Sequence, residues 1–194
     1  IPEGLFFFFF LTNSERINYL QIPNLVTYEF VLTYFNKIMD FEFFFFFITE
    51  IISEYASKAD AESLIHNFFE KVVQAYPGDF FKNVNESYYH GLLFYILWNG
   101  LLRDKYEVLP EFTLPNGQVD IMAKSFPGAR VQHHLNDLFE LKQVPKSATD
   151  AELNSKFKKA ELDMEKYRTG EYAQWRGIAV CFRGNRDYKM KIFL

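Results

Sequence analysis

The chain has 194 residues, of which 49% are hydrophobic and 24% are charged, and its formal net charge is −4. This balance is typical of a globular protein that can bury a core, and it excludes a disordered chain. The length suffices for one domain of about 100 to 200 residues, or for a small domain with an extension. The single cysteine, Cys181, excludes a disulfide within the chain and does not support a zinc cluster.

The charge is unevenly distributed along the chain. From Lys142 to the end there are 12 Lys and Arg residues against 7 Asp and Glu residues, a net charge of +5. The part before Lys142 has 9 against 18, which leaves it at −9. A surface that binds phosphate groups is therefore expected in the C-terminal third.

Two runs of five phenylalanines, at 6–10 and 43–47, raise the aromatic content to 20%. Every face of such a run is apolar, so it fits neither an amphipathic helix nor an alternating strand. Hydrophobic clusters, an interface or a substituted sequence would each explain the runs, and packing without chemistry is the simplest interpretation. Each run is far shorter than the about 20 apolar residues that cross a bilayer, so no membrane partner is expected.

The start of the chain and its cysteine content bear on location. The chain begins Ile-Pro-Glu-Gly, without an initiator Met or a basic leader, so we expect a piece of a longer protein and no signal peptide. A lone cysteine suits a reducing compartment, and we expect a cytoplasmic protein.

The predicted elements change from helices to strands along the chain. Apolar residues recur at helical spacing in four segments. The helices are predicted over 24–39, 59–75, 85–102 and 149–167. Strands, with alternating or continuous apolar residues, are predicted over 106–113, 119–123, 138–141, 177–182 and 189–194.

The order of these elements predicts an α/β fold. Pro115-Asn116-Gly117 is typical of a hairpin turn, so the first three strands should form a meander. The fourth strand should join by a helical crossover, which gives a central mixed sheet flanked by helices. We expect two parts, a helical N-terminal extension over 1–79 and an α/β domain over 80–194.

Three polar residues fall on the predicted strands where they can meet. Glu140 and Lys142 alternate with Leu141 and share one face of their strand, and Asp120 can join them if the two strands are neighbours. Two converging carboxylates favour a hard divalent cation, Mg²⁺ or Mn²⁺. A lysine beside that cation can orient or deprotonate water, or stabilise the charge that builds on a phosphodiester. Each group alone is more often a surface residue, and the combination predicts phosphodiester hydrolysis.

The same region resembles a known family. Glu86-Ser-Tyr-Tyr-His-Gly-Leu-Leu, Gly117-Gln-Val-Asp-Ile-Met and Phe139-Glu-Leu-Lys are similar, in order and spacing, to the PD-(D/E)XK nuclease domain at the C-terminus of AAA-ATPase-like bacterial proteins. The resemblance covers most of residues 80–194 and implies a restriction-endonuclease-like core. Upstream, 19–26 resembles the segment that joins the ATPase part to the nuclease. No Walker motif occurs, so this chain itself is not expected to bind ATP.

The resemblance implies a Mg²⁺-dependent (endo)deoxyribonuclease and assigns residues to it. The implied catalytic residues are Asp120, Glu140, Lys142 and Glu86. The metal set is Asp120, Glu140, Leu141 and Glu86, with Mg²⁺ or Mn²⁺ as cofactor. Family members often carry a glutamine on the helix after the lysine strand, where this chain offers Glu161 or Asp163.

The implied partner is DNA, which basic residues in the C-terminal third would bind through its phosphates. The residues expected to do so are Lys146, Lys156, Lys159, Lys166 and Arg183. A charged helix is otherwise usually a solvated face. Two further residues are candidates for the surroundings of the site. Glu111 is expected as a supporting acid or in a strand-edge salt bridge, and His90 as a packed histidine near the metal.

Two other functions remain open at this stage. One is a catalytically degenerate nuclease fold that binds a protein or a nucleic acid within a larger ATPase-like or toxin-like protein. The other is a purely structural module of a larger ATPase. A protein partner or inhibitor, or an upstream ATPase domain of the parent chain, would then be the partner.

Overall fold

The computed structural model describes residues 41–75, 85–101 and 104–194. The helix predicted at 24–39, the segment 19–26 and the first phenylalanine run lie outside these residues. The second run lies in a helix, α2.

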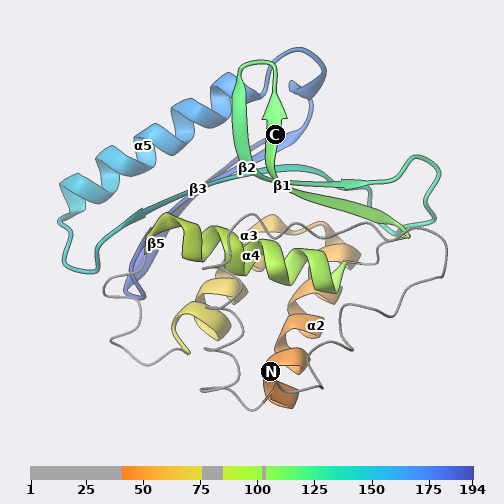
Figure 1. The fold of residues 1–194 in the computed structure, drawn as a ribbon, viewed down its shortest axis with the longest axis horizontal. Coiled ribbons are helices and arrows are strands. Elements are labelled where there is room, and N and C mark those ends of the chain that lie inside the picture. Colours follow the sequence, from red (N-terminus) through yellow and green to blue (C-terminus); the bar gives the residue numbers. More distant parts are fainter. Residues whose placement is uncertain (1–40, 76–84, 102–103) are drawn as a thin grey trace, which may run out of the picture.

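Five strands form one mixed sheet in the order β1-β2-β3-β4-β5 (Figure 1). Their bounds are Tyr106–Leu114 for β1, Gly117–Ser125 for β2, Asn136–Val144 for β3, Arg176–Arg183 for β4 and Asp187–Phe193 for β5. The first three strands are an antiparallel meander, β4 is parallel to β3, and β5 is antiparallel to β4. The predicted meander and the helical crossover before the fourth strand are both confirmed.

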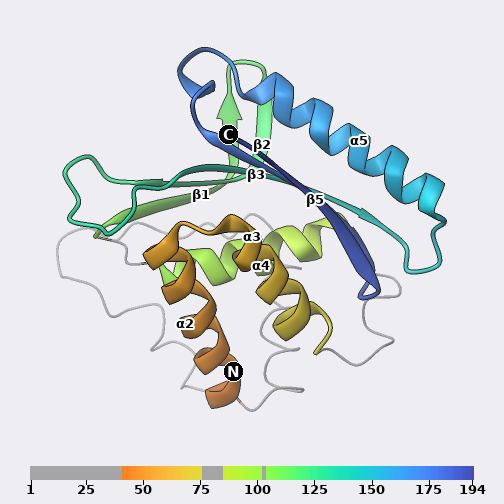
Figure 2. The same ribbon diagram turned by 180° about the vertical axis from the view of Figure 1, so that it is seen from behind.

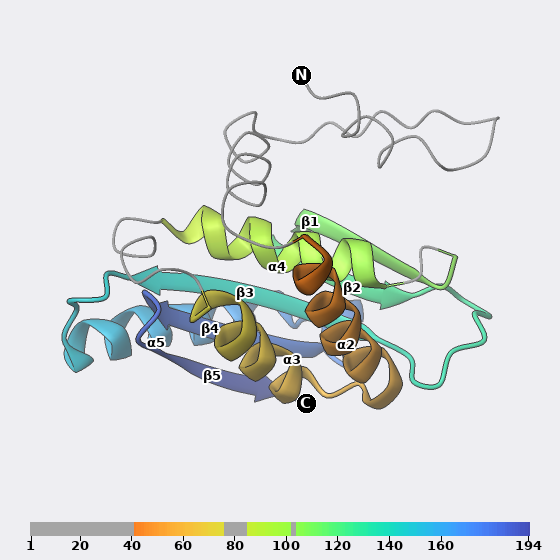
Figure 3. The same ribbon diagram turned by 90° about the horizontal axis from the view of Figure 1, so that it is seen from below.

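Helices cover both faces of the sheet, as Figure 1 and Figure 2 show. They are α2 (Phe41–Lys58), α3 (Ala61–Asn67), the π-helix η2 (Phe68–Val73), α4 (Glu86–Gly100), α5 (Asp150–Tyr167) and the short 3-10 helix η4 (Gly170–Tyr172). The crossover helix α5 lies on one face, and α2, α3 and α4 lie over the other (Figure 3). Among the described helices, none combines the length and the apolar character needed to cross a bilayer.

The single helix predicted at 59–75 is a short α-helix that continues as a π-helix. It begins at Ala61 because the Asp60 side chain caps it, accepting a hydrogen bond of 3.0 Å from the Ser63 N–H. Ala59, just before the cap, has a left-handed φ of 51°, which ends α2 and changes the direction of the chain. The wider turn from Phe68 buries two pairs of apolar residues, Phe68 with Phe69 and Val72 with Val73, on either side of Glu70 and Lys71.

The larger core lies between the sheet and α2, α3, η2 and α4. Its aromatic centre is Phe182 of β4, which stacks on Tyr89 of α4 with ring centroids 4.6 Å apart and also contacts Phe68 and Phe69. Residues between 48 and 73 belong to the same buried cluster as the sheet residues. The described helices before residue 79 therefore pack directly on the sheet.

A buried polar cluster joins the end of α2 to the sheet. Asp137 of β3 is 1% exposed and accepts hydrogen bonds from the Tyr55 hydroxyl and from Arg176, whose Nε lies 2.9 Å from its Oδ1. Arg176 also donates to the Ala59 carbonyl. Burial raises the pKa of Asp137, while the Arg176 guanidinium opposes that shift. The cluster fixes the α2–α3 junction against β3 and β4.

The smaller core lies under α5. Met122, Leu138 and Ala179 of the sheet pack against Ala160 and Met164 of the helix. A Cβ at Gly177 of β4 would lie 2.5 Å from the Met164 sulfur, so a larger residue there would displace the Met164 side chain from its present position. The helix starts with a complete capping box between Thr149 and Glu152. These features fix the face of α5 that points at the sheet.

Candidate active site

Strands β2 and β3 separate at the predicted site. Their antiparallel pairing ends at Ile121 and Phe139. Asp120 is the next residue of β2, and the pairing of β2 with β1 skips from Ile121 to Val119. Beyond this point the tip of the β1–β2 hairpin turns toward α5 (Figure 1). Asp120 thus lies at a fork in the sheet.

The hairpin tip is tied to the C-terminal end of α5. The Asn116 amide donates to the Thr169 hydroxyl at 2.7 Å. This contact holds β2 away from β3 and keeps the fork open beneath α5.

The Asp120 carboxylate links β2 to β3 at the point where the two strands separate. Its Oδ2 accepts a hydrogen bond of 2.6 Å from the Leu141 backbone N–H. A side chain of β2 thereby satisfies a donor of β3 after the regular pairing has ended. Burial raises the pKa of Asp120, and the Leu141 hydrogen bond opposes this shift.

Glu140 and Lys142 form a buried ion pair on the face of β3 that lies toward α5. Phe139 and Leu141 point into the opposite core, as strand alternation requires. Glu140 is 2% exposed and Lys142 is 8% exposed, and the Lys142 Nζ donates to Glu140 Oε1. Within the described chain the other oxygen, Glu140 Oε2, is buried without a hydrogen-bond partner.

The electrostatics of the pair reflect this burial. Burial, followed by the charge of Asp120, raises the pKa of Glu140 to about 8. Burial lowers the pKa of Lys142, but its hydrogen bond to Glu140 and the surrounding carboxylates outweigh that effect and raise it. Lys142 therefore keeps its proton at neutral pH.

Two helices contribute further acids around the lysine. The Lys142 Nζ lies 3.5 Å from Glu86 Oε1, at the start of α4, and 4.0 Å from Asp163 Oδ2, on α5. Glu86 Oε2 is also 3.7 Å from Lys156 Nζ of α5. The sequence did not decide whether Glu161 or Asp163 faces the site. In the structure Asp163 faces it, whereas Glu161 pairs with Lys191 at 2.9 Å. The structure thus brings together all four predicted catalytic residues.

Whether these residues suit a divalent cation can be tested on the donor atoms. In the part of the chain that the structure describes, no three His, Cys, Asp or Glu side chains are arranged as a metal-binding group. Mg²⁺, however, commonly takes only one or two carboxylates, with water and phosphate oxygens as its other ligands. Asp120 and Glu140, with the buried and unpartnered Oε2, fit that donor set. The residues therefore suit a hard divalent cation.

Other residues near the site take different positions. Tyr167 of α5 was not predicted to belong to it, yet burial and the nearby charges of Glu140 and Asp163 raise its pKa to about 12. Helical spacing could have indicated it, since Tyr167 follows Asp163 by one turn. His90 lies close enough to Asp120 for its charge to lower that pKa, against the larger effect of burial. Glu111 is exposed, and its left-handed φ of 49° marks a strained bend in β1 opposite Asp120.

The predicted phosphate-binding residues differ in their surroundings. Lys159 and Lys166 are exposed on α5, and Lys156 is half-buried beside Glu86. Lys146 is half-buried close to Gly184 in the β4–β5 turn. These four lysines remain candidates for DNA contact.

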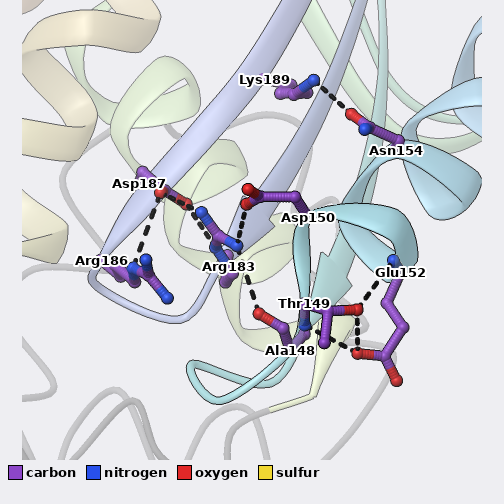
Figure 4. Close-up of polar contacts among 9 residues, drawn as sticks. All are labelled: Ala148, Thr149, Asp150, Glu152, Asn154, Arg183, Arg186, Asp187 and Lys189. Carbon is purple, nitrogen blue, oxygen red and sulfur yellow. Dashed lines mark hydrogen bonds and ion pairs between the residues drawn. The ribbon is translucent and has the colours of Figure 1, made fainter.

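Arg183 does not fit the expectation that it faces DNA. It is 4% exposed, its Nε donates to Asp187 at 2.8 Å, and its Nη1 donates to Asp150 at 2.7 Å and to the Ala148 carbonyl at 3.2 Å (Figure 4). These bonds join the start of α5 to β4 and β5. Arg183 is therefore a structural residue in this fold.

Comparison of the chain with protein-family profiles, with curated proteins and with solved structures finds no match.

Proposed function

We propose that this chain is a metal-dependent nuclease of the PD-(D/E)XK type that hydrolyses phosphodiester bonds in DNA. The observation that carries the proposal is the buried group at the fork of the sheet. There Asp120 accepts a hydrogen bond from the Leu141 N–H, one oxygen of Glu140 has no partner among the described residues, and Lys142 lies beside both acids. Buried carboxylates that repel each other are costly for stability, and such arrangements are characteristic of functional sites.

The roles of the residues follow from their chemistry. Asp120 and Glu140 would hold Mg²⁺ or Mn²⁺, together with the main chain of Leu141, and Glu86 would support it from α4. Such a cation polarises a phosphoryl oxygen and lowers the pKa of a bound water. Lys142, whose pKa is raised, is suited to stabilise charge on the phosphate oxygens, and is not suited to accept a proton from water.

The substrate class follows from charge and from the sequence resemblance. Lys156 lies next to the acids of the site, and Lys159 and Lys166 extend the positive charge along the exposed face of α5. Lysines in this position suit a phosphate backbone. The preference for DNA over RNA rests on the resemblance alone.

Cleavage of supercoiled plasmid tests the proposal. The purified chain should nick the plasmid in Mg²⁺ and leave it intact in EDTA. Lys142→Ala should abolish nicking, while Lys58→Ala, which changes an exposed lysine of α2 on the other side of the sheet, should leave it unchanged. Nicking that survives in EDTA or in Lys142→Ala would contradict the proposal.

One observation favours a degenerate fold as the second candidate. The Lys142 ammonium already donates a hydrogen bond to Glu140, so this buried carboxylate has a positive partner without any cation. In that case the chain would bind DNA or a protein partner within a larger ATPase-like or toxin-like protein. Retention of DNA in EDTA, together with no cleavage in any divalent cation, would favour this candidate.

A further inference from the structure

Lys142 is surrounded by three carboxylates that come from three different elements. Glu140 lies on β3, Glu86 begins α4 and Asp163 lies on α5. The Lys142 Nζ donates to Glu140 Oε1, while Glu86 and Asp163 lie 3.5 and 4.0 Å from the ammonium. Because an ammonium has three N–H donors, Glu86 and Asp163 are further acceptors for Lys142.

The three acids differ in their exposure to solvent. The Glu140 side chain is 3% exposed, whereas Glu86 is 36% and Asp163 is 27% exposed. A lysine has four rotatable methylene groups, so its ammonium can move a few ångström without any change in the backbone. Glu86 and Asp163 are therefore alternative partners that Lys142 can reach.

A divalent cation on Glu140 Oε2 would lie close to the Lys142 ammonium, which is bonded to Oε1 of the same carboxylate. The two positive charges would repel each other, which favours movement of the ammonium away from Glu140 when the cation arrives. Within the described residues, Asp163 has Lys142 as its ion-pair partner, whereas Glu86 is shared with Lys156. Asp163 is thus the acid that is free to receive the lysine.

We propose that Asp163 is a positioning residue that takes up the Lys142 ammonium when a divalent cation binds at Glu140. This inference rests on the proposed function. Paired with Asp163, the Lys142 ammonium would lie beside the substrate phosphate, between the cation and α5.

The test is Mn²⁺ binding, measured by calorimetry on the whole chain. Lys142→Met removes the competitor and should bind Mn²⁺ more tightly than wild type. Asp163→Asn keeps the side-chain shape but removes the acceptor, and should weaken binding by about fivefold. Glu165→Gln, an exposed acid on the same helix, is the control for a general loss of negative charge.

The double variant separates positioning from simple attraction between Asp163 and the cation. If Asp163 acts through the lysine, Asp163→Asn should have little effect on Mn²⁺ affinity in the Lys142→Met background. An equal loss in both backgrounds would overturn the inference, and the nuclease proposal would then still stand on plasmid cleavage. If neither wild type nor Lys142→Met binds Mn²⁺, both proposals fail. Circular dichroism spectra would show that each variant is folded.

Discussion

Asp120 combines a structural and a chemical task in one carboxylate. Its Oδ2 accepts the Leu141 N–H at the point where β2 and β3 separate, and its charge raises the pKa of Glu140 after the larger effect of burial. The first task needs only an acceptor oxygen, whereas the second needs the negative charge. Substitutions can therefore separate the two.

Asp120→Asn should keep the fold and lose the function. The amide oxygen can still accept the Leu141 N–H, so the free energy of unfolding should change little, while cleavage and Mn²⁺ binding should be lost. Asp120→Ala leaves the N–H unsatisfied and should also cost about 1–3 kcal/mol. Urea unfolding measures both variants. An active Asp120→Asn would show that the charge is not needed.

The raised pKa of Glu140 makes stability depend on pH. Because the pKa is about 8 in the folded protein and 4.5 ordinarily, the folded state binds the proton more tightly. This contribution to stability is fully present below about pH 4.5 and is lost as the pH rises through about 8. The contribution should change by at most about 1.4 kcal/mol per pH unit.

Comparison with Glu140→Gln isolates this effect from other titrating groups. The free energy of unfolding of wild type, relative to Glu140→Gln, should fall between about pH 4.5 and 8. Urea unfolding at several pH values measures the difference. A difference that stays constant across this range would show that Glu140 titrates normally.

The site residues differ in how far the sequence alone could identify them. Strand alternation predicted that Glu140 and Lys142 share a face, and the hairpin predicted Asp120 beside them; the structure brings all three together. The choice between Glu161 and Asp163 stayed open, because it depends on how α5 is rotated over the sheet. Arg183 was expected on the DNA-binding surface but is buried, because the sequence shows the charge of a residue and not its burial.

At the level of elements, α5 organises the site. It carries Asp163 and Lys156 toward Glu86 and Lys142, and its C-terminal end binds the tip of the β1–β2 hairpin. Its N-terminal end is fixed by the Thr149 capping box and by Arg183. The position of the helix thus determines the position of its acidic and basic side chains.

Arg183→Ala should lower stability without changing DNA affinity. It removes charged hydrogen bonds to Asp187 and Asp150, both partly or largely exposed acids that water can solvate afterwards. The expected cost is about 1.5–3 kcal/mol. Urea unfolding and fluorescence anisotropy with labelled DNA measure the two effects. A weaker DNA complex at unchanged stability would instead place Arg183 at the interface.

The element boundaries show where sequence patterns are strong and where they fail. Each predicted strand lies on an observed one, although β3 extends well beyond 138–141 because it pairs with β4 from Asp137 to Val144. The π-helical turn after Asn67 was not predicted, since its apolar residues fit an α-helix equally well. Its geometry is set by packing on Phe182, a tertiary contact.

At the scale of the whole molecule, the sheet separates two different surfaces. One face carries α5 and the other carries α2, α3 and α4, as Figure 2 shows. The exposed lysines Lys159 and Lys166 lie on α5, and the large aromatic core lies between the sheet and the helices of the other face. The net charge of −4 conceals this arrangement, because the net charge of +5 from Lys142 to the end is outweighed by −9 in the part before it. DNA binding should therefore depend on the α5 face.

The salt dependence of DNA binding tests this arrangement. Lys159→Ala and Lys166→Ala should each weaken binding and lower the slope of log K against log salt by about 0.9 for double-stranded DNA. Lys58→Ala, on α2 at the opposite face, is the control and should leave the slope unchanged. Equal slopes for all three variants would show that DNA binds elsewhere.

The most direct test of the central claim is an anomalous difference map from crystals grown with Mn²⁺. A divalent cation at the fork should give a peak about 2 Å from a carboxylate oxygen of Asp120 and from Glu140 Oε2. That result would establish the metal centre in which Lys142 and Asp163 act. A map without a peak there, in crystals that contain Mn²⁺ elsewhere, would contradict the account and favour the degenerate fold.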